Sequence, residues 1–125
     1  MAAKRVKFSN LSVEQLVNRF VELAVQQDMA LLSNAQAEIN RLYWKIDAIN
    51  NELKSRPGDQ RSALLPLYKH KNMQVRLKAT YATMALVPNA ARAQLEAIAA
   101  SGWQPQALDA GMSLINLDRG IYKPK

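Results

Sequence analysis

The side chains best suited to chemistry lie in a basic segment, KHKN at residues 69–72, that precedes a stretch of helical periodicity. Arg76 follows one helical turn later, and the chain holds no Asp or Glu between residues 60 and 95. Cations beside the exposed amides of a helix start favour an anion such as phosphate. The alternative is a solvated loop in which Arg76 pairs with an acid such as Asp109 or Asp47.

The residue types that catalysis needs do not occur in a recognisable arrangement. His70 is the only histidine and Cys is absent, so neither a usual zinc site nor a nucleophile–base pair is indicated. The sequence also lacks a phosphate-cradling glycine loop, a paired-carboxylate motif and a nucleophile elbow. The one enzymatic alternative is a DNA glycosylase built on helical repeats, with Asp109 and Trp103 in its groove. We therefore expect a protein that is not an enzyme and uses neither a cofactor nor a metal.

Charge and composition narrow the classes of partner. The chain has 17 Lys and Arg against 10 Asp and Glu, a formal net charge of +7. This charge favours nucleic acid or acidic proteins, although it also serves to keep a small domain soluble. No window approaches the ~20 apolar residues of a transmembrane helix, and no signal-peptide core follows the basic start. With no Cys to suggest an oxidising compartment, we expect a cytoplasmic protein without membrane contact.

The elements that must position these residues are helices. Ala, Leu, Gln, Asn and Arg dominate the composition, which predicts an all-α chain. Ser12 and Gln15 form a capping box at the start of the first helix. Apolar residues from Leu32 to Leu53 then recur at alternating spacings of three and four, which predicts a second, long helix. Together the two helices form a hairpin over residues 12–56.

The turn inside this hairpin carries no Gly or Pro to mark it. We place it within residues 28–34, with Asp28 or Asn34 as the N-cap of the second helix. That helix ends at Arg56, because Pro57 and Gly58 follow.

Four shorter helices are predicted in the second half of the chain. Asp59 caps the first of them, and Pro66 kinks or shortens it. Asn72 caps the second, which is apolar on two sides, and Pro88 opens the third. Pro105 starts the last helix, after a turn at Ser101 and Gly102.

Two tryptophans lie at the margins of this pattern. Trp44 falls one position off the apolar seam of the long helix, and Trp103 follows a glycine in a turn. Because large aromatic side chains are usually well buried, we expect both to pack against the core. The alternative is that each stands exposed as an interface anchor.

An internal repeat organises the second half. The apolar pattern of residues 63–67 returns at 93–97, and that of 77–79 returns at 108–110. Two helix–turn–helix units of this kind bury their apolar faces only by stacking, so we expect a stack of three hairpins, about six helices in a single short α-solenoid. The predicted organisation is a single domain at 1–125, comprising the long hairpin at 12–56, a repeat at 59–87, a degenerate second repeat at 88–118 and an extended tail at 119–125.

Residues 63–87 resemble a HEAT repeat. The first helix of such repeats commonly carries a mid-helix proline, here Pro66, and the second begins with a Val-Arg pair and a small residue, here Val75-Arg76 and Ala79. The whole chain, including ALLSNAQAEINRLYWKI and WQPQALDAGMSLINLDRGIYKP, resembles an uncharacterised bacterial family, the domain of unknown function numbered twenty-nineteen, which is regarded as HEAT-like. The resemblance implies that the hairpins form a HEAT-like, right-handed stack, and it supplies no activity.

The basic segment departs from the HEAT-like pattern. Turns of that class usually carry acidic residues six and four positions before the arginine, and here those positions hold His70 and Asn72. The resemblance therefore implies that Arg76 has kept its helix cap and lost its local carboxylate.

Two hypotheses for function follow. The first is a protein–protein interaction scaffold that grips an acidic or, by analogy, a toxin-type bacterial protein on the face of its second helices. The second is nonspecific binding of a nucleic-acid backbone by residues 60–95 and the arm Lys4-Arg5-Lys7, without signatures of sequence readout. The candidate partner-binding residues are Lys69, Lys71, Arg76, Lys78, Thr80 and Thr83.

Overall fold

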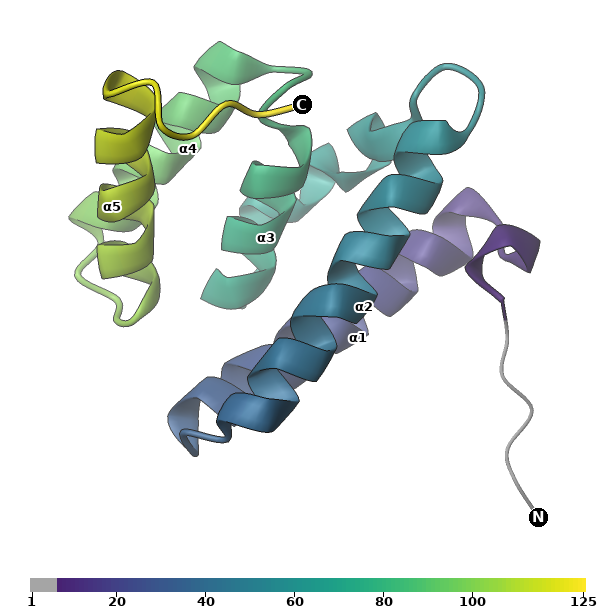
Figure 1. The fold of residues 1–125 in the computed structure, drawn as a ribbon, viewed down its shortest axis with the longest axis horizontal. Helices are drawn as coiled ribbons and strands as arrows, with labels where there is room; N and C mark the ends of the chain where they lie inside the picture. The colour runs from purple at the N-terminus through teal and green to yellow at the C-terminus, as the bar shows by residue number, and fades with distance from the viewer. Residues whose placement is uncertain (1–6) are drawn as a thin grey trace. The chain divides into compact units, whose positions relative to one another are not determined.

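The computed structural model describes residues 7–125, and all regular structure in that range is helical (Figure 1). The all-α prediction is confirmed. The chain divides into two compact units, with the boundary between Ala63 and Leu64. Lys4 and Arg5 of the predicted basic arm lie outside the described residues. In chain order the elements are the 3-10 helix η1 (Phe8–Asn10), α1 (Val13–Leu32), α2 (Gln36–Ser55), the 3-10 helix η2 (Gln60–Lys69), α3 (Met73–Thr83), α4 (Pro88–Ala100) and α5 (Gln106–Asp118).

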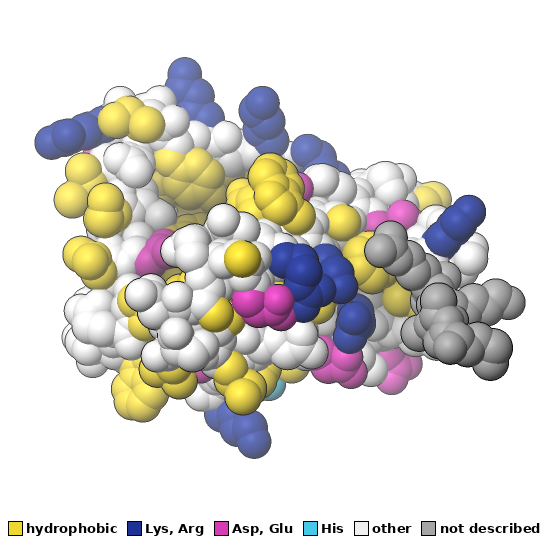
Figure 2. All heavy atoms as spheres, turned by 60° about the horizontal axis from the view of Figure 1, so that its bottom comes forward, with side chains coloured by type: hydrophobic (Ala, Val, Ile, Leu, Met, Phe, Trp, Pro, Cys, Tyr) yellow, Lys and Arg dark blue, Asp and Glu magenta, His cyan; other side chains and the backbone are white. Residues whose placement is uncertain are grey.

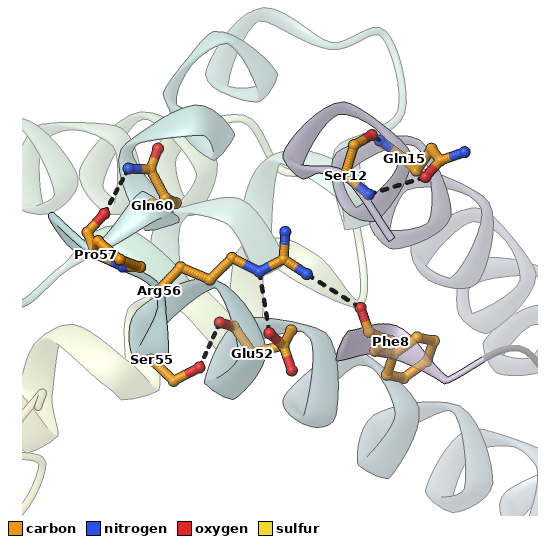
Figure 3. A network of polar contacts seen from close by, with 8 residues as sticks. All are labelled: Phe8, Ser12, Gln15, Glu52, Ser55, Arg56, Pro57 and Gln60. Carbon is orange, nitrogen blue, oxygen red and sulfur yellow. Dashed lines mark hydrogen bonds and ion pairs between the residues drawn. The ribbon is translucent and has the colours of Figure 1, made fainter. Parts of the chain in front are cut away.

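The first unit is built on the hairpin of α1 and α2. The predicted capping box is confirmed: the Ser12 hydroxyl accepts the Gln15 N–H at 3.1 Å, and the Gln15 side chain accepts the Ser12 N–H at 2.8 Å (Figure 3). Burial of the apolar stripes on both helices holds the pair together. The buried apolar residues of the two helices are Leu16, Phe20, Leu23, Ala24, Ala30, Leu42, Ile46, Ile49 and Leu53.

The turn between α1 and α2 corrects the expected cap. Asn34 adopts a left-handed conformation with φ 54°, and its N–H donates to the Leu31 carbonyl at 3.2 Å. The Ala35 N–H donates to the Ala30 carbonyl at 3.0 Å, which completes a Schellman motif at the end of α1. Asn34 therefore ends α1 and does not cap α2, and Asp28 lies within α1. The N-cap position of α2 is Ala35, which provides no side-chain cap.

Arg56 connects the end of α2 to η1 through its guanidinium group. Its guanidinium donates to the Glu52 carboxylate at 3.0 Å and to the carbonyl of Phe8 in η1 at 3.2 Å (Figure 3). The pair is only about one-fifth exposed, so solvent screens it less than an ordinary surface pair.

The segment around Pro66 is a 3-10 helix and not the α-helix we expected. Proline lacks the N–H that an α-helix needs at this position and its ring crowds the preceding turn, which favours the tighter geometry. Asp59 also differs from the simple cap that we expected, because its carboxylate accepts both the Arg61 N–H at 3.3 Å and the Arg61 guanidinium. This helix crosses the boundary between the two units.

The second unit packs α4 against both α3 and α5. The Asn72 side chain caps α3 and Pro88 is the first residue of α4, as predicted. After α5, the chain turns at Gly120 and the Tyr122 N–H donates to the Asn116 carbonyl at 3.1 Å. One cluster of buried apolar residues in this unit comprises Leu77, Met84, Ala91, Leu95, Ile98 and Ala110.

Candidate partner-binding surfaces

The basic turn before α3 is held in shape by its own polar groups. His70 accepts the Asn72 N–H on its Nδ1 atom at 3.0 Å, and the Arg76 guanidinium donates to the His70 carbonyl. Lys69 and Lys71, on either side of His70, are exposed. Arg76 therefore stabilises the turn, and the positive charges of Lys69 and Lys71 are exposed to solvent.

The start of α3 offers less to an anion than the sequence suggested. The Asn72 side-chain oxygen accepts the Gln74 N–H at 3.0 Å and the Val75 N–H at 3.1 Å. A bound anion would compete with this cap for the same two amides.

Two other cations within residues 60–95 are neutralised by carboxylates. Arg61 is buried, and its guanidinium lies 2.8 and 2.7 Å from the two Asp59 carboxylate oxygens. The hydrogen bond from Arg61 lowers the pKa of Asp59 below its ordinary value. Arg92 pairs with Asp118 at 2.9 Å. On the face seen in Figure 2, the Lys and Arg side chains are dispersed, and Asp and Glu side chains lie among them.

The two acidic side chains predicted as partners of Arg76 both accept hydrogen bonds within their own units. Asp109 accepts the Tyr81 hydroxyl, which also lies 2.7 Å from the Ser113 hydroxyl. Burial, together with the Asp109 carboxylate, raises the pKa of Tyr81 above its ordinary value. Asp47 accepts the side-chain amide of Asn51 at 3.3 Å.

The two threonines of the predicted binding face are not on the surface. Thr80 and Thr83 are 0% exposed, which corrects the expectation that they bind a partner together with Arg76. The Thr80 hydroxyl donates to the Arg76 carbonyl at 2.6 Å, and the Thr83 hydroxyl donates to the Ala79 carbonyl at 2.8 Å. Threonine tolerates burial here because a carbonyl one helical turn back satisfies its hydroxyl.

Of the other predicted residues, Lys69 and Lys71 are exposed, whereas Arg76 and Lys78 are half-buried. The structure brings Lys69, Lys71 and Arg76 together at one turn. It leaves Lys78 on the next turn of α3.

Both tryptophans are exposed, so the expectation that they pack against the core is wrong. Trp44 is 66% exposed and Trp103 is 62% exposed. The Trp44 ring meets the ring of Tyr43, itself 45% exposed, in a T-shaped contact with centroids 5.1 Å apart.

The position of Trp44 on α2 explains its exposure. At about 100° per residue, Trp44 points away from the buried stripe that runs from Leu42 to Leu53. The helical period could have predicted this exposure from the sequence, because Trp44 lies on the side of the helix opposite the buried stripe.

Within residues 7–125 no group of three or more His, Asp or Glu side chains lies close enough together to hold a metal ion. In the same part of the chain, every helix is too short or too polar to span a bilayer.

Comparisons with known proteins place the chain in a family. The model of a family described as a domain of unknown function (DUF2019) matches residues 14–118. The crystal structure of the protein RPA1889 from Rhodopseudomonas palustris CGA009 is 49% identical in sequence, with a TM-score of 0.92 over 97% of this chain and 100% of that one. No curated protein matches. From residue 14 to residue 118, the chain therefore belongs to the DUF2019 family.

Proposed function

We propose that the chain is a non-enzymatic protein-binding module and that Trp44, on the outer face of α2, anchors its partner. The observation that carries this proposal is the exposure of the Trp44 ring. Tryptophan and tyrosine dominate the binding energy of many interfaces because they bury a large area with few rotatable bonds. An aromatic pair left in water therefore favours a surface that is covered in a complex.

The side chains around Trp44 fit the rim of such an interface. Asn40 is exposed one helical turn earlier and accepts the Gln36 amide at 2.9 Å. Arg41 forms an ion pair with Glu38, which raises the pKa of Arg41 through their hydrogen bond. Because these polar groups already have partners within α2, a protein covering the ring would leave few of them unsatisfied.

Replacing Trp44 by Ala tests the proposal. The immobilised chain is used to capture proteins from the cells that express it, with recovery measured by quantitative mass spectrometry. We expect a stoichiometric partner whose affinity falls about 30-fold in Trp44→Ala, the effect of losing a hot spot worth about 2 kcal/mol.

The matched control is Leu32→Ala, which removes another exposed apolar side chain from the same unit. It should retain the partner. Equal recovery by the wild type and by Trp44→Ala would show that the anchor is wrong.

A phosphate backbone is the second candidate ligand, favoured by the basic turn. In the part of the chain that the structure describes, neither Lys69 nor Lys71 forms an ion pair, and both are exposed. If they contact phosphates, DNA and RNA oligomers should bind with an affinity that falls steeply with salt, because each contact releases about 0.7 to 0.9 of a counterion.

Fluorescence anisotropy with labelled oligomers measures this. The Lys69→Glu/Lys71→Glu variant should then lose binding and flatten the salt dependence. Lys45→Glu/Lys54→Glu, which changes two cations in the other unit, is the charge-matched control. Absence of binding at low salt would exclude this candidate.

A further inference from the structure

The outer face of α5 carries an apolar stripe that nothing in its own unit covers. Leu108, Met112 and Ile115 are each more than half exposed and follow the i, i+4, i+7 spacing of a single helix face. They point away from the buried Ala110. Figure 2 shows hydrophobic side chains at the edge of the molecule where α5 lies in Figure 1. A stripe of this kind, with no charge along it, is typical of a helix that packs against another helix.

Gly111, beside this stripe, has no explanation within the chain. It lies in the middle of α5, where glycine destabilises a helix relative to alanine, and its φ is not positive. A Cβ atom built on Gly111 would meet nothing within 4 Å, so packing within the chain does not explain why this residue lacks a side chain. Close approach by a helix from another molecule would require glycine here, because a residue without a Cβ atom lets two helix backbones pack closer together.

The two ends of the stripe carry an aromatic ring and a cation, two groups that attract each other. Trp103 is exposed just before α5, and its carbonyl accepts the Ala107 N–H at 2.8 Å. Arg119, exposed at the other end, continues the stripe at i+11 and forms no ion pair within the described residues. An arginine over the face of an indole is a favourable cation–π contact. From Trp103 to Arg119 the face therefore carries an aromatic ring, an aliphatic side chain, glycine, an aliphatic side chain and a cation. When a second copy of the face lies antiparallel to the first, the ring of each copy meets the cation of the other, and aliphatic side chains meet each other.

We propose that a second copy of the chain binds along α5 in an antiparallel orientation, with Gly111 and Met112 at the two-fold axis. In this arrangement Leu108 of each copy packs on Ile115 of the other, and Arg119 of each copy lies over Trp103 of the other. Antiparallel pairing also aligns the two helix dipoles favourably. The same surface patch is used on both copies, as a two-fold dimer requires.

The size of the patch sets the strength of the dimer. One helix face with an aromatic end is smaller than the roughly 800 Å² per partner of a standard stable interface. The dimer is therefore weak, with dissociation in the micromolar range. It uses a different unit from the Trp44 surface, so either proposal can fail without the other.

Sedimentation over a concentration series from micromolar to millimolar tests the dimer. The wild-type chain should shift reversibly from monomer to dimer. Met112→Glu should remain monomeric, whereas Met29→Glu, which places the same charge on an exposed methionine of α1, should dimerise as the wild type does. A wild-type chain that stays monomeric throughout, or a Met112→Glu variant that dimerises normally, would overturn the proposal.

Gly111→Ala separates an interface role from a structural one. Alanine should raise the melting temperature of the monomer because it is the better helix former, and it should weaken dimerisation at least about 10-fold because its Cβ separates the helices. If Gly111→Ala raises the melting temperature and leaves the dimer unchanged, α5 is not the contact.

Cysteine cross-linking tests the antiparallel orientation, since the natural chain has no Cys. Under mild oxidation, a mixture of the Leu108→Cys and Ile115→Cys variants should form a mixed disulfide. Leu108→Cys alone should not form one efficiently. Efficient self-cross-linking of Leu108→Cys would show a parallel pair and overturn the proposed arrangement.

Discussion

A Thr80→Glu variant is expected to lower the free energy of unfolding of the second unit by more than about 4 kcal/mol, a large fraction of the total stability of a small domain. Thr80 has no exposed surface, and its hydroxyl is satisfied by the Arg76 carbonyl. A glutamate at this position would bury a larger, charged side chain, and the guanidinium of Arg76, one turn earlier on α3, already donates to the His70 carbonyl. Circular dichroism during urea denaturation measures the effect.

Thr80→Val is the matched control for this prediction. Valine keeps the shape of threonine and loses one hydroxyl, whose acceptor already receives the backbone N–H of residue 80 in the α-helix. Its cost should stay within about 1.5 kcal/mol. A Thr80→Glu variant with the wild-type denaturation midpoint would show that this side of α3 is open to solvent. It would also restore Thr80 and Thr83 as candidates for a binding face.

A Phe20→Ala variant is expected to lower the free energy of unfolding of the first unit by about 3–5 kcal/mol. Phe20 is 0% exposed on α1, so its loss removes a large buried area and leaves a cavity in the hairpin. Because α1 supports the helix that carries Trp44, the variant should also lose the proposed partner. Leu32→Ala, at a position that is 78% exposed, should change the stability by less than about 0.5 kcal/mol.

Thermal and urea denaturation of both variants measure the difference. A Phe20→Ala chain as stable as Leu32→Ala would contradict the packing of α1 on α2 described above.

The sequence predicted well what local chemistry decides. The capping box of Ser12 and Gln15, the Asn72 cap and the Pro88 helix start each depend on residues within one turn of one another, and all three lie where expected. The apolar seam predicted the buried side of α2 from Leu42 to Leu53, since helical period alone determines which residues share a face. Its predicted start was wrong, because Leu32 is the last residue of α1 and is exposed.

Other features depend on contacts that the sequence pattern does not reveal. Asn34 ends α1 through a left-handed residue that is not glycine, so the usual signal for such a turn was missing. Thr80 and Thr83 were taken for surface residues because they are polar, yet backbone carbonyls of their own helix satisfy them. Hydroxyl groups are therefore weak evidence of exposure on a helix that is apolar on both sides.

The binding surfaces were predicted only in part. Sequence charge identified Lys69 and Lys71 as exposed cations at a turn, but it counted Arg61 and Arg92 with them. Those two arginines pair with Asp59 and Asp118, one of which lies far along the chain. The exposure of Trp44 went against the general tendency of tryptophan to be buried, and only its position relative to the α2 seam indicated it.

Photo-cross-linking from Asn40 tests the protein-binding proposal most directly. Asn40 is exposed one turn from Trp44, and a benzoylphenylalanine at this position would touch whatever covers the ring. In cells that express the chain, we expect one discrete cross-linked protein from position 40, none from the control position Asn18 on α1, and loss of the product when Trp44→Ala is added. Equal cross-linking from both positions, or a product that persists without the indole, would contradict a partner anchored on α2.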